Sequence, residues 1–257
     1  MARDLYLFER IDVIGQGAYA YMEHLKKDPV LQMPDMFKLQ GTFYVVGITG
    51  RWPEVVNIWD VPGGWDGWYA NVDRLNLKRK KAFYEDWWDE AAQWRSSGFD
   101  RLCAAIPGSP TTEEIRERGI HGTVFMNELT RVRPGTQLEY LEAVREVRVP
   151  TMADHGYIAT GLWQVQWSPT EVITVWATDV DAHVRLQKSR DVAAGFATAE
   201  ESGVDGDARL LEWERTALDY VTDSREELMT PCPGMVYSPD AYEDPGDWAQ
   251  HIPDVRS

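Results

Sequence analysis

The sequence predicts an α+β fold made of two tandem ferredoxin-like (βαββαβ) repeats that form an α+β barrel. Residues 54–60 read Glu-Val-Val-Asn-Ile-Trp-Asp, and residues 171–177 read Glu-Val-Ile-Thr-Val-Trp-Ala. Both are β-branched runs that follow a turn with a proline, which is typical of strands. The same order of strands and helices surrounds each run, and this indicates a duplication. We expect Trp59 and Trp176 to be equivalent packing points of two sheets.

The first repeat is predicted to cover residues 1–112. Leu5–Val13 alternates with a period of two, as a half-buried strand does. Tyr19, Met22 and Leu25 have helical spacing and predict a helix that ends near Pro29. The other predicted elements are strands at residues 41–48, 54–60 and 102–106, with helical stretches around residues 65–75 and 87–94.

The second repeat is predicted to cover residues 120–234, after a polar linker at residues 109–119. Thr136 and Glu139 have the spacing of a capping box at the start of its first helix. The predicted elements are strands at residues 123–132, 158–167 and 171–177, helices around residues 138–144, 179–190 and 210–221, and a closing segment at residues 228–234. Residues 235–257 have no counterpart in the first half, and we interpret them as a C-terminal arm.

Composition and charge exclude several classes of function. The chain has 257 residues and a net charge of −16, so its surface is a poor partner for nucleic acid or anionic membranes. No apolar run approaches the roughly 18 residues that span a membrane. The N-terminal residues show no secretory pattern, which predicts a cytoplasmic protein. Cys103 and Cys232 are the only cysteines and form no Cys-x-x-Cys pair, so a zinc site is not predicted.

The motifs of the second repeat resemble those of the NIPSNAP family of the dimeric α+β barrel superfamily. The resemblance is carried by Glu128, Pro134-Gly135, Tyr140-Leu141-Glu142, Pro150, Gly161, residues 171–176 and residues 228–231. The first repeat keeps Glu9, Tyr21, Glu23, Pro34, Gly41, residues 54–59 and Pro107, but has Gly-Gln-Gly in place of Pro-Gly. The resemblance implies a tandem or paired α+β barrel. The superfamily includes cofactor-free monooxygenases, isomerases, cyclases and heme enzymes, so the fold does not determine the chemistry.

Four residues are candidates for acid-base catalysis. Glu9 and Glu128 occupy equivalent positions in the two repeats, each on an otherwise apolar strand face. A carboxylate in such a place must be paired or must have a raised pKa, and a raised pKa suits a general acid or base. The alternative is a structural Glu that pairs with an Arg. Among the histidines, His155 is the first candidate and His24 the second; the alternative for each is a surface or internally bonded His.

Aromatic side chains predict a substrate pocket. Trp65 and Trp68 follow a Pro-Gly-Gly segment, and Trp163 and Trp167 fall on one face of a predicted strand. An aromatic wall opposite a carboxylate would hold an apolar ligand, whereas the alternative is ordinary core packing. No metal site is predicted, because the carboxylates of residues 85–90 read as a solvated helix face. The basic run at residues 78–81 has the same interpretation.

These observations favour an enzyme that acts on a small hydrophobic or aromatic molecule by general acid-base chemistry and without a cofactor. The predicted reaction classes are isomerase, cyclase, lyase and oxygenase. One alternative is a non-enzymatic binding protein, and another is a heme protein with His24, His155 or His183 as the axial ligand. We expect a homodimer or a higher homo-oligomer, with no nucleic-acid or membrane partner. Whether the repeats pair within one chain or between two chains stays open.

Overall fold

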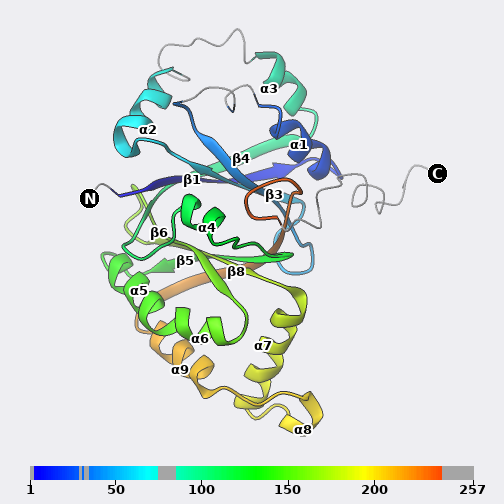
Figure 1. The fold of residues 1–257 in the computed structure, drawn as a ribbon, viewed down its shortest axis with the longest axis vertical. Coiled ribbons are helices and arrows are strands. Elements are labelled where there is room, and N and C mark those ends of the chain that lie inside the picture. Colours follow the sequence, from blue (N-terminus) through cyan, green and yellow to red (C-terminus); the bar gives the residue numbers. More distant parts are fainter. Residues whose placement is uncertain (1–2, 29–30, 32–34, 75–84, 239–257) are drawn as a thin grey trace, which may run out of the picture. The chain divides into compact units, whose positions relative to one another are not determined.

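The computed structural model describes residues 3–28, 31, 35–74 and 85–238 (Figure 1). The chain forms two compact units. The first contains the described residues of Met1–Cys103 and of Met229–Ser257, and the second is Ala104–Leu228. The last residues of β8 therefore belong to the first unit, although they close the second repeat in the sequence. Within the described residues, no helix is both long and apolar enough to cross a membrane.

The first unit is an antiparallel sheet with helices packed on it. Its elements are β1 (Leu5–Val13), α1 (Ala18–Leu25), β2 (Lys38–Val45), β3 (Glu54–Asp60), α2 (Gly64–Val72), α3 (Glu85–Ala91) and most of β4 (Arg95–Ala105). β3 lies between β1 and β2 and is antiparallel to both. Residues of α1 and α3 bury their apolar side chains with Ile11, Val55 and Trp59 of the sheet, so these helices cover one sheet face.

The second unit repeats this plan. Its elements are α4 (Thr112–Glu117), β5 (Val124–Val132), α5 (Gln137–Ala143), the π-helix η3 (Val144–Arg148), α6 (Val149–Asp154), β6 (Ile158–Val165), β7 (Glu171–Thr178), α7 (Val180–Ala193), α8 (Ala199–Ser202), α9 (Ala208–Ala217) and most of β8 (Val221–Pro231). β7 lies between β5 and β6 and is antiparallel to both. The order of elements in both units is βαββαβ, so the predicted α+β class with ferredoxin-like repeats is confirmed.

The strand register makes the duplication visible. Glu9 of β1 lies opposite Asn57 of β3, and Glu128 of β5 lies opposite Thr174 of β7. Both second strands have an irregularity just before a glycine, Gly41 in one and Gly161 in the other. A Cβ on Gly161 would lie 2.5 Å from the Trp163 ring, and one on Gly41 would lie 2.7 Å from the Phe43 ring. Each position therefore requires glycine so that an aromatic ring can lie over the backbone.

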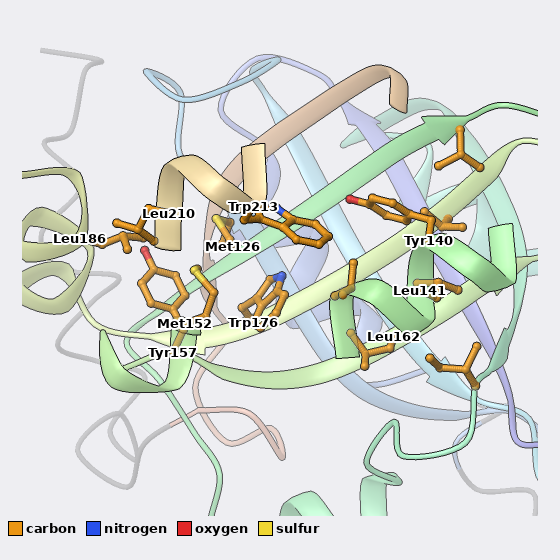
Figure 2. Packing of buried hydrophobic residues seen from close by; sticks show 14 residues of the cluster. Met126, Tyr140, Leu141, Met152, Tyr157, Leu162, Trp176, Leu186, Leu210 and Trp213 are labelled. Carbon is orange, nitrogen blue, oxygen red and sulfur yellow. The ribbon is translucent and has the colours of Figure 1, made fainter. Parts of the chain in front are cut away.

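The core of the second unit lies between its helices and the sheet. Figure 2 shows Trp213 of α9 and Met152 of α6 packed near Met126 and Trp176 of the strands. These side chains are at most 7% exposed. Burying large aromatic side chains removes apolar area from water at about 25 cal/mol per Å², so this cluster stabilises the unit strongly.

Three local predictions need correction. The expected linker contains α4, whose capping box is formed by Thr111 and Glu114. Thr136 makes no such cap; its hydroxyl donates instead to the Arg133 carbonyl, at 2.9 Å. β4 begins at Arg95, seven residues before the predicted start. Its first part is exposed and polar, so the apolar pattern marks only its buried end.

Pro150 and the C-terminal arm complete the comparison with the sequence. Pro150 lies at the start of α6, directly after the π-helix η3. Its counterpart Pro34 and the basic run at residues 78–81 lie outside the described residues. The described start of the C-terminal arm packs on the first unit: Tyr237 is buried, and its ring centroid lies 5.6 Å from that of Phe43.

Candidate functional site

A cavity of about 220 Å³ lies in the second unit between the sheet and the helices. Its apolar wall is made of Met126, Tyr140, Met152, Leu186, Leu210 and Trp213. Figure 2 shows these side chains gathered between the strands and α5, α6, α7 and α9. Charged side chains complete the lining, among them Arg148 and Glu226. An apolar pocket with a few polar groups is the usual form of a small-molecule site.

Arg148 is the centre of the charged part of this cavity. Its Nη2 lies 2.5 Å from Glu128 Oε1 and 3.3 Å from Glu226 Oε1. The guanidinium carbon lies 5.5 Å from the ring centroid of Trp176 and 5.4 Å from that of Trp213, within the range of cation–π contacts. Its Nε is buried and has no hydrogen-bond partner among the described residues. Arg148 therefore joins two carboxylates to the aromatic wall and keeps one donor unused.

The π-helix explains how the chain places Arg148. Residue Pro150 has no amide hydrogen, and its ring would collide with the carbonyl of residue 146 in a regular helix. The chain widens just before this proline, and the Val149 amide donates to the Val144 carbonyl five residues back. Such π-turns occur frequently at functional sites. Arg148 is the last residue of this widened turn.

Glu128 lies behind the cavity and is only 1% exposed. Its Oε2 accepts hydrogen bonds from Trp176 Nε1, at 2.9 Å, and from the Thr174 hydroxyl. Burial raises the pKa of Glu128 to about 7, against the opposing effect of Arg148 and with an added contribution from Glu226. Glu128 can therefore gain or lose a proton near neutral pH.

Glu226 borders the cavity and is the second carboxyl of the cluster. Burial works to raise its pKa, although its side chain is 49% exposed; Arg148 and a hydrogen bond with Glu128 outweigh burial and lower the pKa. Two nearby carboxyls whose pKa values are driven apart can share one proton, with Glu128 protonated and Glu226 ionised. Burial, aided by Glu128, raises the pKa of Tyr140 to about 12, so Tyr140 stays a neutral hydroxyl in the lining.

The first unit holds a related cluster around Glu9. Its Oε2 accepts from Trp59 Nε1 at 2.5 Å and from Asn57 Nδ2 at 3.2 Å. Burial and the charge of Asp100 raise the pKa of Glu9 to about 7. Arg95 supplies positive charge nearby, with its guanidinium 5.9 Å from the Tyr21 ring centroid. The duplicated Glu–Trp pair is therefore a property of the fold, whereas the close Arg148 ion pair belongs to the second unit.

The predicted histidines lie elsewhere. His155 Nε2 lies 3.0 Å from Asp207 Oδ2 at the end of α6. His24 is buried in the first unit, with its Nε2 3.0 Å from the Trp87 carbonyl and its ring stacked on Trp87. No histidine is among the described residues that line the cavity. The structure gives both histidines local partners, which matches the structural alternative.

None of the four predicted substrate-binding tryptophans lines this cavity. Trp65 and Trp68 contact each other on α2, with ring centroids 6.0 Å apart, and Trp65 is 45% exposed. Trp163 is buried over Gly161. Trp167 lies beyond the end of β6 and is 72% exposed. The predicted strand was too long by two residues, so Trp163 and Trp167 do not share a strand face.

Sequence reasoning found Glu128 but missed the residues that give it a cavity. Arg148, Glu226 and Trp213 were not candidates, and Tyr140 entered only as part of the family resemblance. A buried Glu requires a partner, but the chain has 26 Lys and Arg residues, and the sequence does not show which of them pairs with Glu128. The only local signal for Arg148 is the Val149-Pro150 pair that follows a helical stretch.

The fold is similar to that of solved structures. No protein-family model matches the chain, and no curated protein sequence does. A putative monooxygenase from Fusobacterium nucleatum matches with a TM-score of 0.51 and 10% identity, over 90% of this chain and 93% of that one. A putative monooxygenase from Lactobacillus acidophilus matches with a TM-score of 0.54 and 8% identity, over 89% and 94%.

Chlorite dismutase from Candidatus Nitrospira defluvii also matches, with a TM-score of 0.41 and 9% identity over 90% of this chain and 93% of that one. The two monooxygenase matches show that this chain shares their fold. The prediction that this protein needs no cofactor does not stand, because the solved structures show a shared fold alone and a shared fold does not exclude a cofactor. His24, His155 and His183 do not line the cavity, so none of them is placed to ligate a group bound there. Among the described residues, no group of three or more His, Cys, Asp or Glu could hold a metal ion.

Proposed function

We propose that the cavity of the second unit is the active site of an enzyme that moves a proton on a small, largely apolar molecule. The observation that carries this proposal is the Glu128–Arg148–Glu226 cluster at an apolar cavity, with the pKa of Glu128 near 7. A general base is most effective when its pKa is close to the working pH. Isomerases, cyclases, lyases and oxygenases that begin with a proton transfer are the reaction classes that fit.

Each charged residue has its own role in this proposal. Glu226 borders the cavity and exchanges a proton with the ligand. Once Glu128 has lost its own proton, above about pH 7, it can take over the ligand's proton from Glu226 through the hydrogen bond between the two carboxyls. While Glu128 is protonated, the positive charge of Arg148 balances the negative charge of Glu226, and the cluster is neutral. When Glu128 loses its proton, the cluster carries one net negative charge.

The apolar wall determines the size of the ligand. A cavity of about 150 Å³ in another protein holds benzene, so about 220 Å³ suits one substituted ring. Trp213 and Tyr140 offer aromatic faces, and the thioethers of Met126 and Met152 adapt to an irregular outline. This wall takes the place of the predicted tryptophan wall.

The ring opening of 5-nitrobenzisoxazole tests for the proposed base. A base removes the proton on carbon 3, the N–O bond breaks, and the coloured 2-cyano-4-nitrophenolate forms without any further reactant. We expect the wild-type rate constant to rise with pH through about 7, because only the ionised Glu pair accepts a proton. Glu226→Gln and Glu128→Gln are expected to lower the rate about 10²-fold, as general-base deletions do.

The matched control is Glu171→Gln, because Glu171 is a buried Glu of the same unit that does not line the cavity. Its rate constant should equal that of the wild type, with circular dichroism and thermal unfolding confirming that every variant is folded. Equal rates in the wild type and in both cavity variants would contradict the proposal.

The finer assignments stay predictions. Similarity of the second repeat to the NIPSNAP family, a homodimeric or larger assembly, and a cytoplasmic location are consistent with this proposal, and none of them is needed for it.

A further inference from the structure

The unused donor of Arg148 indicates what the ligand carries. Arg148 lines the cavity and is 8% exposed. Its Nη2 is engaged by Glu128 and Glu226, whereas its Nε has no partner among the described residues. A buried donor without an acceptor is unfavourable. A ligand acceptor that reaches Nε, with a small shift of the side chains that cover this atom, gains a hydrogen bond to a charged group.

The charges around the cavity determine which acceptor fits. Arg148 and Arg190 line it with Glu214 and Glu226, two charges of each sign. Arg190 is already paired, with its Nη2 2.5 Å from Glu214 Oε1. Behind Arg148 lies Glu128. An anionic ligand would therefore add negative charge beside Glu226 and Glu128, whereas an uncharged oxygen adds none.

We propose that the ligand is an uncharged aryl carbonyl compound whose oxygen accepts the Nε–H hydrogen bond of Arg148. This inference rests on the proposed function and names its substrate class. Its ring lies among the apolar side chains, and the carbon next to the carbonyl faces Glu226. When the C–H bond of that carbon breaks, the proton goes to Glu226 and the electron pair forms a carbon–carbon double bond. The carbonyl oxygen takes the negative charge, which Arg148 stabilises, and return of the proton from Glu226 to that oxygen gives the enol isomer.

Three probes of nearly equal shape separate the possibilities. Acetophenone carries a carbonyl oxygen, α-methylstyrene has a methylene group in its place, and benzoate carries a negative charge. Binding to the full chain at pH 8 is measured by calorimetry. We expect acetophenone to bind at least tenfold more tightly than α-methylstyrene, with benzoate the weakest of the three.

The variant Arg148→Lys keeps the positive charge beside Glu128 but removes the Nε donor. It should reduce the preference for acetophenone over α-methylstyrene to less than threefold. The matched control is Arg131→Lys, whose arginine pairs with Glu171 outside the cavity and which should keep the wild-type preference. Should Arg148→Lys not fold, the wild-type comparison of the three probes still decides.

Equal binding of acetophenone and α-methylstyrene by the wild type would overturn the inference, as would benzoate binding most tightly. These outcomes are distinct from those for the proposed function. A protein that opens 5-nitrobenzisoxazole but shows no carbonyl preference contradicts only the substrate class. A protein that prefers acetophenone but lacks the base activity supports the carbonyl site and contradicts the acid-base role.

Discussion

Replacement of Arg148 with Met is expected to lower the free energy of unfolding by about 3–5 kcal/mol at pH 8, the usual effect of removing one partner of a buried ion pair. Methionine fills the space of the arginine stem, so loss of the charge dominates the effect. Glu128, which is 1% exposed, would then be an uncompensated charge above its pKa. Urea unfolding of the variant and the wild type measures the difference.

The same variant should lose less stability at pH 5. The pKa of Glu128 in the folded protein is already above its ordinary value of 4.5, and removal of Arg148 raises it further. At pH 5 the folded variant keeps the proton on Glu128, so no charge is stranded. The double variant Glu128→Gln/Arg148→Met should recover part of the loss at pH 8. A control, Arg131→Met, removes an exposed arginine whose Nε lies 3.5 Å from Glu171 and should cost less than about 1 kcal/mol. An equal loss for Arg148→Met at both pH values would contradict this account.

Glu9→Gln is expected to stabilise the protein above pH 7. Burial and Asp100 raise the pKa of Glu9 from 4.5 to about 7. Below pH 4.5 Glu9 is protonated in both the folded and the unfolded chain, so its ionisation has no effect on stability. Between pH 4.5 and 7 only the unfolded chain releases the proton, so the wild type loses stability as the pH rises.

Gln cannot ionise, and its amide oxygen can still accept from Trp59. A shift of this size corresponds to at most about 3 kcal/mol, and partial exposure of Glu9 reduces the expected gain to about 2 kcal/mol. The measurement is the difference in free energy of unfolding between Glu9→Gln and the wild type from pH 4 to 8. The difference should grow by that amount across this range. If the difference in free energy of unfolding does not change with pH, the pKa of Glu9 is the same in the folded and the unfolded chain, and the prediction is wrong.

Much of the fold could be predicted because strands and buried stripes leave periodic patterns. β1 and β3 lie where the alternation and the β-branched run placed them. The exposed half of β4 left no such pattern, since its polar side chains read as a loop. Thr136 has the spacing of a helix cap, but its hydroxyl donates to the Arg133 carbonyl instead. Spacing alone does not decide whether a Thr hydroxyl bonds to a backbone amide of the helix or to a nearby carbonyl.

The candidate site was only partly predictable. Glu128 could be found because a carboxylate on an apolar strand face is unfavourable unless it is paired or protonated. Its partners could not, because Arg148 is 20 residues away on a π-helix and Glu226 is on the last strand, 78 residues beyond Arg148. Such contacts depend on the tertiary fold. His155 and His24 stay predictions, and their neighbours in space, Asp207 and Trp87, could not be inferred because they are distant in the sequence.

The most direct test is an NMR titration of the glutamate side-chain carboxyl carbons with ¹³C labelling, with and without acetophenone. Two resonances are expected to titrate near pH 7, one lost in Glu9→Gln and the other in Glu128→Gln. Of these two resonances, only that of Glu128 should shift its midpoint when the ligand binds, because Glu9 belongs to the first unit and Glu128 belongs to the cluster at the cavity. The acid-base site proposed for the second unit is contradicted if Glu128 instead titrates near pH 4.5. It is also contradicted if the titration midpoint of Glu128 is the same with and without the ligand.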